Sequence, residues 1–274
     1  MLLAGLGGSA HTYDDLAPRL TDSFRVIALT RRGTGESGRP STGYDVSSRA
    51  RDDLDVLDSL RVDSAYFVGH SIAGDELTEL ATRYPNRVAG VLYLDAAYDR
   101  STMPSVGVSD PDMQVVHAPL IQTFDELLNF RRRSPLGLPP AMETDFWKTV
   151  RGEDGELVSS PPLPIMLAMI AESKRWHPDY AKIRAPTIAI YAFSLERPLT
   201  NVLLRPSDSV ERQKSNELWR SEHWAWQNQE IARLVRGNPS AKVIVLNPAD
   251  HLVYFSNSAA VLDAIRSLLP KSPR

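Results

Sequence analysis

The sequence of 274 residues predicts an α/β fold, in which a mostly parallel sheet is covered by helices on both faces. Three observations support this class. Short β-branched apolar runs alternate with helical patterns over the first hundred residues, the same alternation resumes near residue 185, and the stretch between them has no clear strand. Because ligands bind such sheets at the carboxyl ends of their strands, we expect functional residues directly after strands.

Apolar β-branched runs mark the strands of the first half, and apolar residues at helical spacing mark its helices. The predicted elements are, in chain order, a strand at 24–29, a helix at 47–60, a strand at 65–68, a helix at 75–84 and a strand at 88–94. Pro85 ends the second helix because proline cannot continue one. Residues 1–4 resemble the tail of a strand, so we expect either a sheet without earlier strands or a chain trimmed at its N-terminus.

The alternation stops after Asp99, and prolines at 134–140 and 159–164 punctuate helical patches up to residue 184. We therefore expect residues 100–184 to form a helical cap over an α/β core made of residues 1–99 and 185–274. The core resumes with four elements: a strand at 187–191, a long helix at 209–236, a strand at 243–246 and a helix at 259–269.

Composition narrows the class of protein. Lysine and arginine number 31 against 34 acidic residues, a net charge of −3, which argues against a nucleic-acid-binding surface. The absence of cysteine excludes disulfide scaffolds, thiolate zinc sites and a cysteine nucleophile. No run approaches the ~18 apolar residues of a membrane-spanning helix, and the first residues lack the basic region of a signal peptide. We expect no membrane contact and a cytoplasmic location.

The strongest local signal is the segment Gly69-His70-Ser71-Ile72-Ala73-Gly74, between a predicted strand and a predicted helix. Its small residues allow a strand to turn sharply into a helix. Such a turn would project the Ser71 hydroxyl above the sheet, at a helix N-terminus whose free N–H groups favour negative charge. This context predicts a nucleophilic serine, whereas the plainer alternative is a strand–helix turn that happens to contain serine.

Two other loops carry matching chemistry. Among six histidines, only His251 combines a late position, a preceding strand and a following helix, and a serine needs such a base to become a nucleophile. The glycine-rich loop at residues 4–8 follows a strand end, where it could turn its backbone N–H groups toward an oxyanion.

Taken in order, these motifs resemble those of the α/β-hydrolase superfamily, in particular its esterases and lipases, over nearly the whole chain. Residues 2–8 resemble the family's H-G loop, residues 32–37 its R-G-x-G-x-S loop, and Asp250-His251 its D-H loop. The resemblance implies Ser71 as nucleophile, His251 as general base, and the N–H groups of Leu6 and Ile72 as oxyanion hole. Ala4 replaces the usual histidine of the first loop, so we expect a changed hydrogen bond there.

The acid of the triad stays open between several residues. The family usually places it after the strand at 187–191, where Glu196 is the available carboxylate. Asp95 instead ends the strand after the nucleophile helix, an arrangement similar to that of pancreatic-type lipases. We favour Asp95, with Glu196 and then Asp99 as alternatives. A helix-capping or loop role is the non-catalytic interpretation of Asp95.

The resemblance implies a serine hydrolase that cleaves small to medium apolar esters or lactones through an acyl-enzyme, with a small-molecule ester as partner and no cofactor or metal. A cofactor-free perhydrolase or a C–C bond hydrolase on the same triad is the alternative, and a hydrolase-fold ligand receptor is a further one. Oligomeric state and stereoselectivity stay open. Apolar cap residues should either line the substrate pocket or bury the cap's own core: Met113, Leu120, Phe124, Phe146, Trp147, Met166 and Met169.

Overall fold

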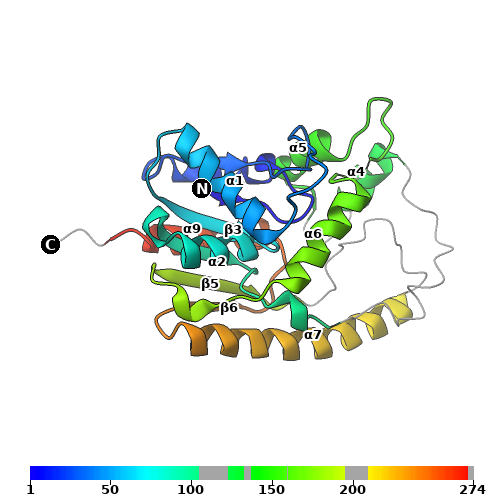
Figure 1. The fold of residues 1–274 in the computed structure, drawn as a ribbon. Coiled ribbons are helices and arrows are strands. Elements are labelled where there is room, and N and C mark those ends of the chain that lie inside the picture. The colour runs from blue at the N-terminus through cyan, green and yellow to red at the C-terminus, as the bar shows by residue number, and fades with distance from the viewer. Residues whose placement is uncertain (105–122, 133–136, 159, 195–208, 271–274) are drawn as a thin grey trace.

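A computed structural model of the chain describes residues 1–104, 123–132, 137–158, 160–194 and 209–270. Within them, six strands form one sheet in the order β2-β1-β3-β4-β5-β6, and every neighbouring pair is parallel. The predicted α/β fold is thereby confirmed (Figure 1). The strands are β1 (Leu2–Leu3), β2 (Ala28–Leu29), β3 (Ala65–His70), β4 (Val88–Leu94), β5 (Thr187–Ala192) and β6 (Lys242–Leu246).

Both faces of the sheet are buried. Along β4, Val91 and Tyr93 belong to one core cluster while Leu92 and Leu94 belong to another, as the alternation of side chains along a strand requires. One cluster takes in side chains of α1 (Val46–Ser59), α2 (Ala73–Arg83) and α7 (Ser209–Gly237). The other takes in side chains of α8 (Val253–Ser256) and α9 (Ser258–Ser267). This two-sided burial explains the nearly continuous apolar sequence of the central strands.

The first two strands are shorter than the sequence indicates. Of the residues predicted as a strand at 24–29, only Ala28 and Leu29 pair. Their partner β1 has two residues, so the register is limited to Leu2 with Ala28 and Leu3 with Leu29. Helix α2 begins two residues earlier than predicted, at Ala73, because the chain passes from strand to helix with almost no loop.

Three α-helices occupy the described part of the predicted cap: α4 (Phe124–Arg132), α5 (Pro140–Thr149) and α6 (Leu163–Arg175). In Figure 1 they lie together beside one end of the sheet. The proposed division of the chain at residues 100 and 184 stays a prediction. Met113 and Leu120, two predicted pocket residues, lie outside the described residues.

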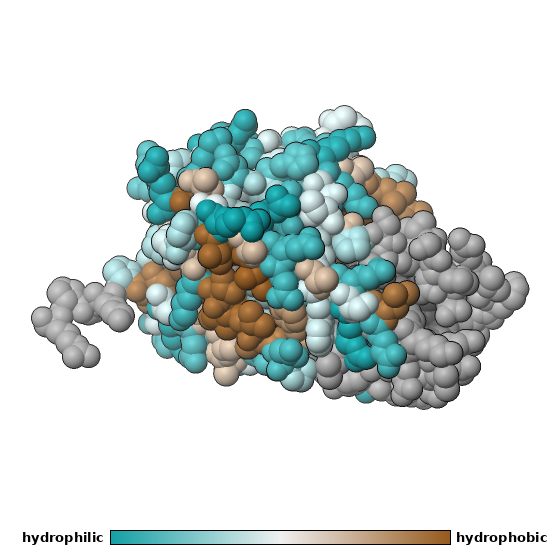
Figure 2. All heavy atoms as spheres, turned by 90° about the horizontal axis from the view of Figure 1, so that it is seen from below, coloured by the Kyte–Doolittle hydropathy of each residue, from teal (hydrophilic) through white to brown (hydrophobic). Residues whose placement is uncertain are grey.

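The strand order puts β2 and β6 at the edges of the described sheet. Val245 on β6 is half exposed, and Figure 2 shows a hydrophobic area on the molecular face seen from below. The strands that precede Ser71 and Asp95, β3 and β4, lie at the centre of the sheet instead.

No helix in the described ranges combines the length and apolar character needed to cross a bilayer.

Candidate active site

The turn around Ser71 is strained in the way the sequence indicates. Ser71 has a φ of 54°, in the left-handed region that non-glycine residues seldom adopt. A Cβ added at Gly69 would lie 2.6 Å from Leu77, and one at Gly74 would lie 1.9 Å from the carbonyl oxygen of Ala96. The small residues are therefore required for the close approach of α2 to the sheet. Strain of this kind persists mainly at functional sites.

Asp95 and His251 meet although they lie 156 residues apart. The Nδ1 atom of His251 lies 2.5 Å from Oδ2 of Asp95. Asp95 directly follows β4, has a φ of 49° and is almost fully buried. The 3.0 Å contact between Nε2 of His70 and the carbonyl oxygen of His251 joins the His251 loop to the residue before Ser71. The histidine loop and the serine turn thus meet at the carboxyl end of the sheet.

The second carboxylate oxygen of Asp95 also accepts hydrogen bonds. Its Oδ1 accepts hydrogen bonds from the backbone N–H of Ala192, at 3.1 Å, and from the Tyr98 hydroxyl. Burial opposes ionisation of the carboxyl, but the hydrogen bonds from His251, Tyr98 and Ala192 outweigh it and hold the pKa of Asp95 below its ordinary value. The lowered pKa favours the carboxylate form of Asp95, which contacts Nδ1 of His251 and not its Nε2.

The alternative acids are placed differently. The carboxylate of Asp99 has other partners, since it accepts hydrogen bonds from Ser101 and lies 3.4 Å from the guanidinium of Arg233. Glu196 lies outside the described residues. Of the three carboxylates weighed from the sequence, Asp95 is the one that contacts His251 in the described structure.

The first glycine-rich loop passes directly over the serine turn. A Cβ added at Gly5 would lie 3.2 Å from Cβ of Ser71 and 2.6 Å from Nδ1 of His70. The next residue, Leu6, packs in one apolar cluster with Ile72. The two predicted oxyanion residues therefore lie near each other and near Ser71.

Comparison with known proteins identifies the family of the chain. The model of the family described as "Alpha/beta hydrolase family" matches residues 1–264. The chain belongs to the alpha/beta hydrolase family. Among solved structures, this α/β hydrolase superposes on E-2-(acetamidomethylene)succinate hydrolase with a TM-score of 0.68 and 21% identity, over 97% of its own length and 89% of that chain. An N-acyl homoserine lactone degrading enzyme gives 0.63 and 21%, over 98% and 92%.

Curated relatives match over shorter stretches. The α/β hydrolase is 43% identical over 98 residues to a mycobacteriophage protein named for non-heme haloperoxidase activity, which is 35% of each chain. The first three curated relatives are aligned over only 35%, 62% and 33% of their own lengths.

Several residues that support Asp95 were not predicted from the sequence. Gln227, on α7, donates from Nε2 to the Tyr98 hydroxyl at 2.8 Å and to the carbonyl of Ala192 at 3.0 Å. The Tyr98 ring stacks on Trp226 with centroids 4.6 Å apart. For Tyr98, the only hint in the sequence that it could support Asp95 was its position three residues after that candidate acid. Nothing in the sequence connects Gln227 to a carboxylate 132 residues earlier.

Helix α6 packs against Leu6 and Ile72, the two residues predicted to form the oxyanion hole. Met169 is fully buried in the cluster that holds Leu6 and Ile72, together with Tyr44. This places one predicted pocket residue at the site. Phe124 and Trp147 instead pack against each other within the cap, with ring centroids 4.8 Å apart, as in the alternative weighed from the sequence.

The cap is also tied to the first loop by a buried carboxyl. Asp145 on α5 accepts hydrogen bonds from the backbone N–H of Ser9, at 2.7 Å, and from its hydroxyl, at 2.5 Å. Burial raises the pKa of Asp145 to about 6, and the hydrogen bonds from Ser9 only partly oppose this rise.

Asp145 is therefore expected to make the fold less stable as pH rises. Its proton is bound more tightly in the folded than in the unfolded chain, so its contribution is complete below about pH 4 and is lost as pH passes about 6. The loss should be at most about 3 kcal/mol. Urea unfolding of the parent and Asp145→Asn at pH 4, 5, 6 and 7 measures it. The parent's free energy of unfolding should fall relative to the variant across this window, and parallel curves would contradict the assignment.

Proposed function

We propose that this α/β hydrolase is a serine hydrolase that cleaves carboxylic esters or lactones through an acyl-enzyme intermediate. The observation that carries the proposal is the 2.5 Å contact between Asp95 and His251, made next to the strained turn of Ser71. A buried carboxylate that orients an imidazole beside a serine is the arrangement that activates a hydroxyl for acyl transfer.

In the proposed reaction, the Ser71 hydroxyl attacks the acyl carbonyl while Nε2 of His251 takes its proton. Asp95 accepts the Nδ1–H of His251 and stabilises the imidazolium that forms. His251 then gives the proton to the leaving alcohol oxygen, and the carbon–oxygen bond of the ester breaks. A water molecule, deprotonated by His251, attacks the acyl-enzyme and releases the carboxylic acid and free Ser71.

The N–H groups of Leu6 and Ile72 are the proposed oxyanion hole. The backbone at Ile72 lies at the start of α2, where N–H groups have no partner within the helix. A hydrogen bond aimed at the tetrahedral oxygen strengthens as negative charge develops there, and removal of one such donor lowers kcat by about 10²- to 10³-fold in a known serine hydrolase.

We propose small to medium apolar acyl groups or lactones as substrates, because the cap residues beside Leu6 and Ile72 are apolar. Ile165, Ala168 and Met169 of α6 all pack in that cluster. Two solved structures of the same fold are an N-acyl homoserine lactone degrading enzyme and E-2-(acetamidomethylene)succinate hydrolase, and both names are compatible with acyl transfer to water.

Met169→Ala is expected to shift the preference toward longer acyl chains. The shorter side chain would leave space beside the oxyanion residues, and each accommodated methylene changes relative kcat/KM by about tenfold or more. The measurement is kcat/KM for p-nitrophenyl acetate, butyrate and octanoate. Leu167→Ala is the matched control, because Leu167 lies on the same helix but is 55% exposed. An equal shift in both variants would show that Met169 does not limit the acyl chain.

The proposed function is tested by turnover and by labelling. A p-nitrophenyl ester should give many turnovers per enzyme, and a fluorophosphonate probe should label Ser71, as located by peptide mass spectrometry. A single stoichiometric burst with a stable acyl adduct would instead favour a ligand receptor. Absence of both ester turnover and Ser71 labelling would contradict the proposal.

A second candidate, cofactor-free perhydrolysis, is favoured by the phage relative named for non-heme haloperoxidase activity. In this reaction hydrogen peroxide replaces water as the group that attacks the acyl-enzyme, and a peracid leaves. Peracid formed from an acetate ester and hydrogen peroxide, compared with acetate formed in water, separates the two reactions.

A further inference from the structure

We propose that Arg31 is a positioning residue for the oxyanion hole. Held by Glu76, it joins the first glycine-rich loop to helix α2 and so sets the distance between the backbone N–H groups of Leu6 and Ile72. The inference rests on the proposed function, since it assigns a role in the same reaction. It assigns no contact between Arg31 and the substrate.

The first half of the argument is the contact between Arg31 and the nucleophile helix. Arg31 lies two residues after β2, and its guanidinium binds the carboxylate of Glu76 in a bidentate manner. Nε and Nη2 each donate over 2.6 Å to a different oxygen of Glu76. Glu76 is in the first turn of α2, four residues after Ile72, and both side chains are buried. A planar two-bond contact of this type fixes orientation as well as distance.

The second half is the contact between Arg31 and the oxyanion loop. The same guanidinium donates through Nη2 to the carbonyl of Ala4, at 2.9 Å, and through Nη1 to the carbonyl of Gly5, at 3.4 Å. These are the two residues immediately before Leu6. Ala4 also stands where the resemblance to other α/β hydrolases led us to expect a histidine and a changed hydrogen bond. One arginine thus holds both backbone segments that supply the proposed oxyanion N–H groups.

The charges around Glu76 favour a stable ion pair between Arg31 and Glu76. Arg49 contacts the same carboxylate from α1, with its Nη1 3.0 Å from Oε1. Burial opposes ionisation of Glu76, but the two arginines outweigh it and lower its pKa. A buried ion pair adds little net stability over well-packed apolar side chains, and in some proteins it fixes one arrangement among several. Here the arrangement fixed is the position of Leu6 relative to Ile72.

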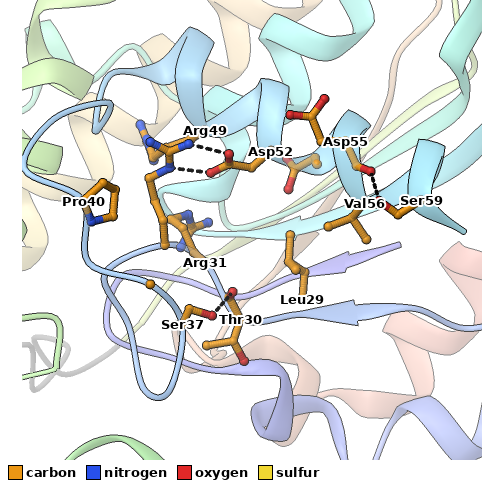
Figure 3. A pocket seen from close by; sticks show the side chains of 13 residues that line it. Leu29, Thr30, Arg31, Ser37, Pro40, Arg49, Asp52, Asp55, Val56 and Ser59 are labelled. Atoms are coloured by element: carbon orange, nitrogen blue, oxygen red, sulfur yellow. Dashed lines mark hydrogen bonds and ion pairs between the residues drawn. The ribbon is translucent and has the colours of Figure 1, made fainter.

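Arg31 borders a pocket, and Glu76 is not among the residues that line it. A pocket of about 390 Å³ lies between the end of β2 and α1, and Arg31, Arg32, Asp52 and Leu29 are among the side chains that line it (Figure 3). Truncation of Arg31 would extend this pocket toward Glu76. A free guanidinium ion could then enter and occupy the place of the lost side chain.

The test is Arg31→Ala assayed with and without millimolar guanidinium chloride. A p-nitrophenyl ester should show kcat lowered about 10²-fold with KM nearly unchanged, because a misplaced donor acts on the transition state. Affinity for an aryl boronic acid, which forms a tetrahedral adduct with a serine, should fall similarly. Guanidinium should restore at least a tenth of the lost rate, whereas sodium chloride should not.

Arg32→Ala is the matched control. Arg32 is the next residue, lines the same pocket and pairs with Asp52, but both side chains are partly exposed. Its kcat should stay within threefold of the parent and should not respond to guanidinium. Should Arg31→Ala fail to fold, Arg31→Lys carries the test, since it keeps the charge but loses the bidentate contact and should lower kcat without changing KM.

A kcat for the folded Arg31 variant within threefold of the parent would overturn the inference, as would a loss that appears in KM alone or that guanidinium leaves unchanged. Labelling of Ser71 by the fluorophosphonate probe separates this failure from failure of the proposed function. If the probe labels Ser71 and the parent hydrolyses the ester, but substitution of Arg31 leaves kcat unchanged, only the positioning role of Arg31 is wrong.

Discussion

Ser71→Ala is expected to lower ester turnover on the order of 10⁵-fold, because no other group could form the acyl-enzyme. Folding should be unaffected, since alanine and serine at this left-handed position are about equally strained. The measurement is kcat for a p-nitrophenyl ester, with the urea midpoint as a check of folding.

Ser59→Ala, on α1, provides the control for Ser71→Ala. Ser59 is exposed and its hydroxyl donates to the backbone carbonyl of Asp55 in the same helix, so its removal should leave kcat unchanged. A Ser71→Ala protein that keeps more than a tenth of the parent activity would refute the nucleophile assignment.

Asp95→Asn is expected to lower kcat on the order of 10⁴-fold, because an amide favours the wrong tautomer of His251. Asp99→Asn is a closely matched control. Asp99 is similarly buried and lies four residues away, but in the described part of the chain its carboxylate contacts Ser101 and Arg233 and not His251. Glu196→Gln is also measured, because Glu196 is the main alternative acid weighed from the sequence.

Pre-steady-state kinetics sharpens the interpretation of Asp95→Asn. Both acylation and deacylation should slow, because His251 acts as a base in each step. Equal and mild losses in Asp95→Asn and Glu196→Gln would mean that neither carboxylate orients the imidazole.

The sequence predicted those parts of the site that depend on local backbone geometry. The turn at Ser71 requires small neighbours, and a Cβ at Gly69 or Gly74 would clash. The two glycines can be recognised in the sequence without knowledge of the fold. The sheet likewise followed from runs of apolar residues. Where pairing depends on a partner, as in the two-residue strand β2, the local pattern overestimated the length.

Long-range polar contacts could not be predicted in the same way. Arg31 and Glu76 are 45 residues apart, and neither lies in a recognisable charge pattern. Asp95 was favoured from the sequence, but its contact with His251, 156 residues later, is visible only in the fold. Local sequence therefore located the reactive groups but not the residues that hold them.

The left-handed backbone at both Ser71 and Asp95 has a consequence for the evolution of this enzyme. Each such residue destabilises the native state by about 1–3 kcal/mol, and glycine would relieve that strain at either position. Heat resistance and catalytic competence are thus opposed at the two places where adjacent central strands end. With the catalytic roles proposed for Ser71 and Asp95, a lineage selected for durability alone would drift toward glycine there and lose its ester hydrolysis.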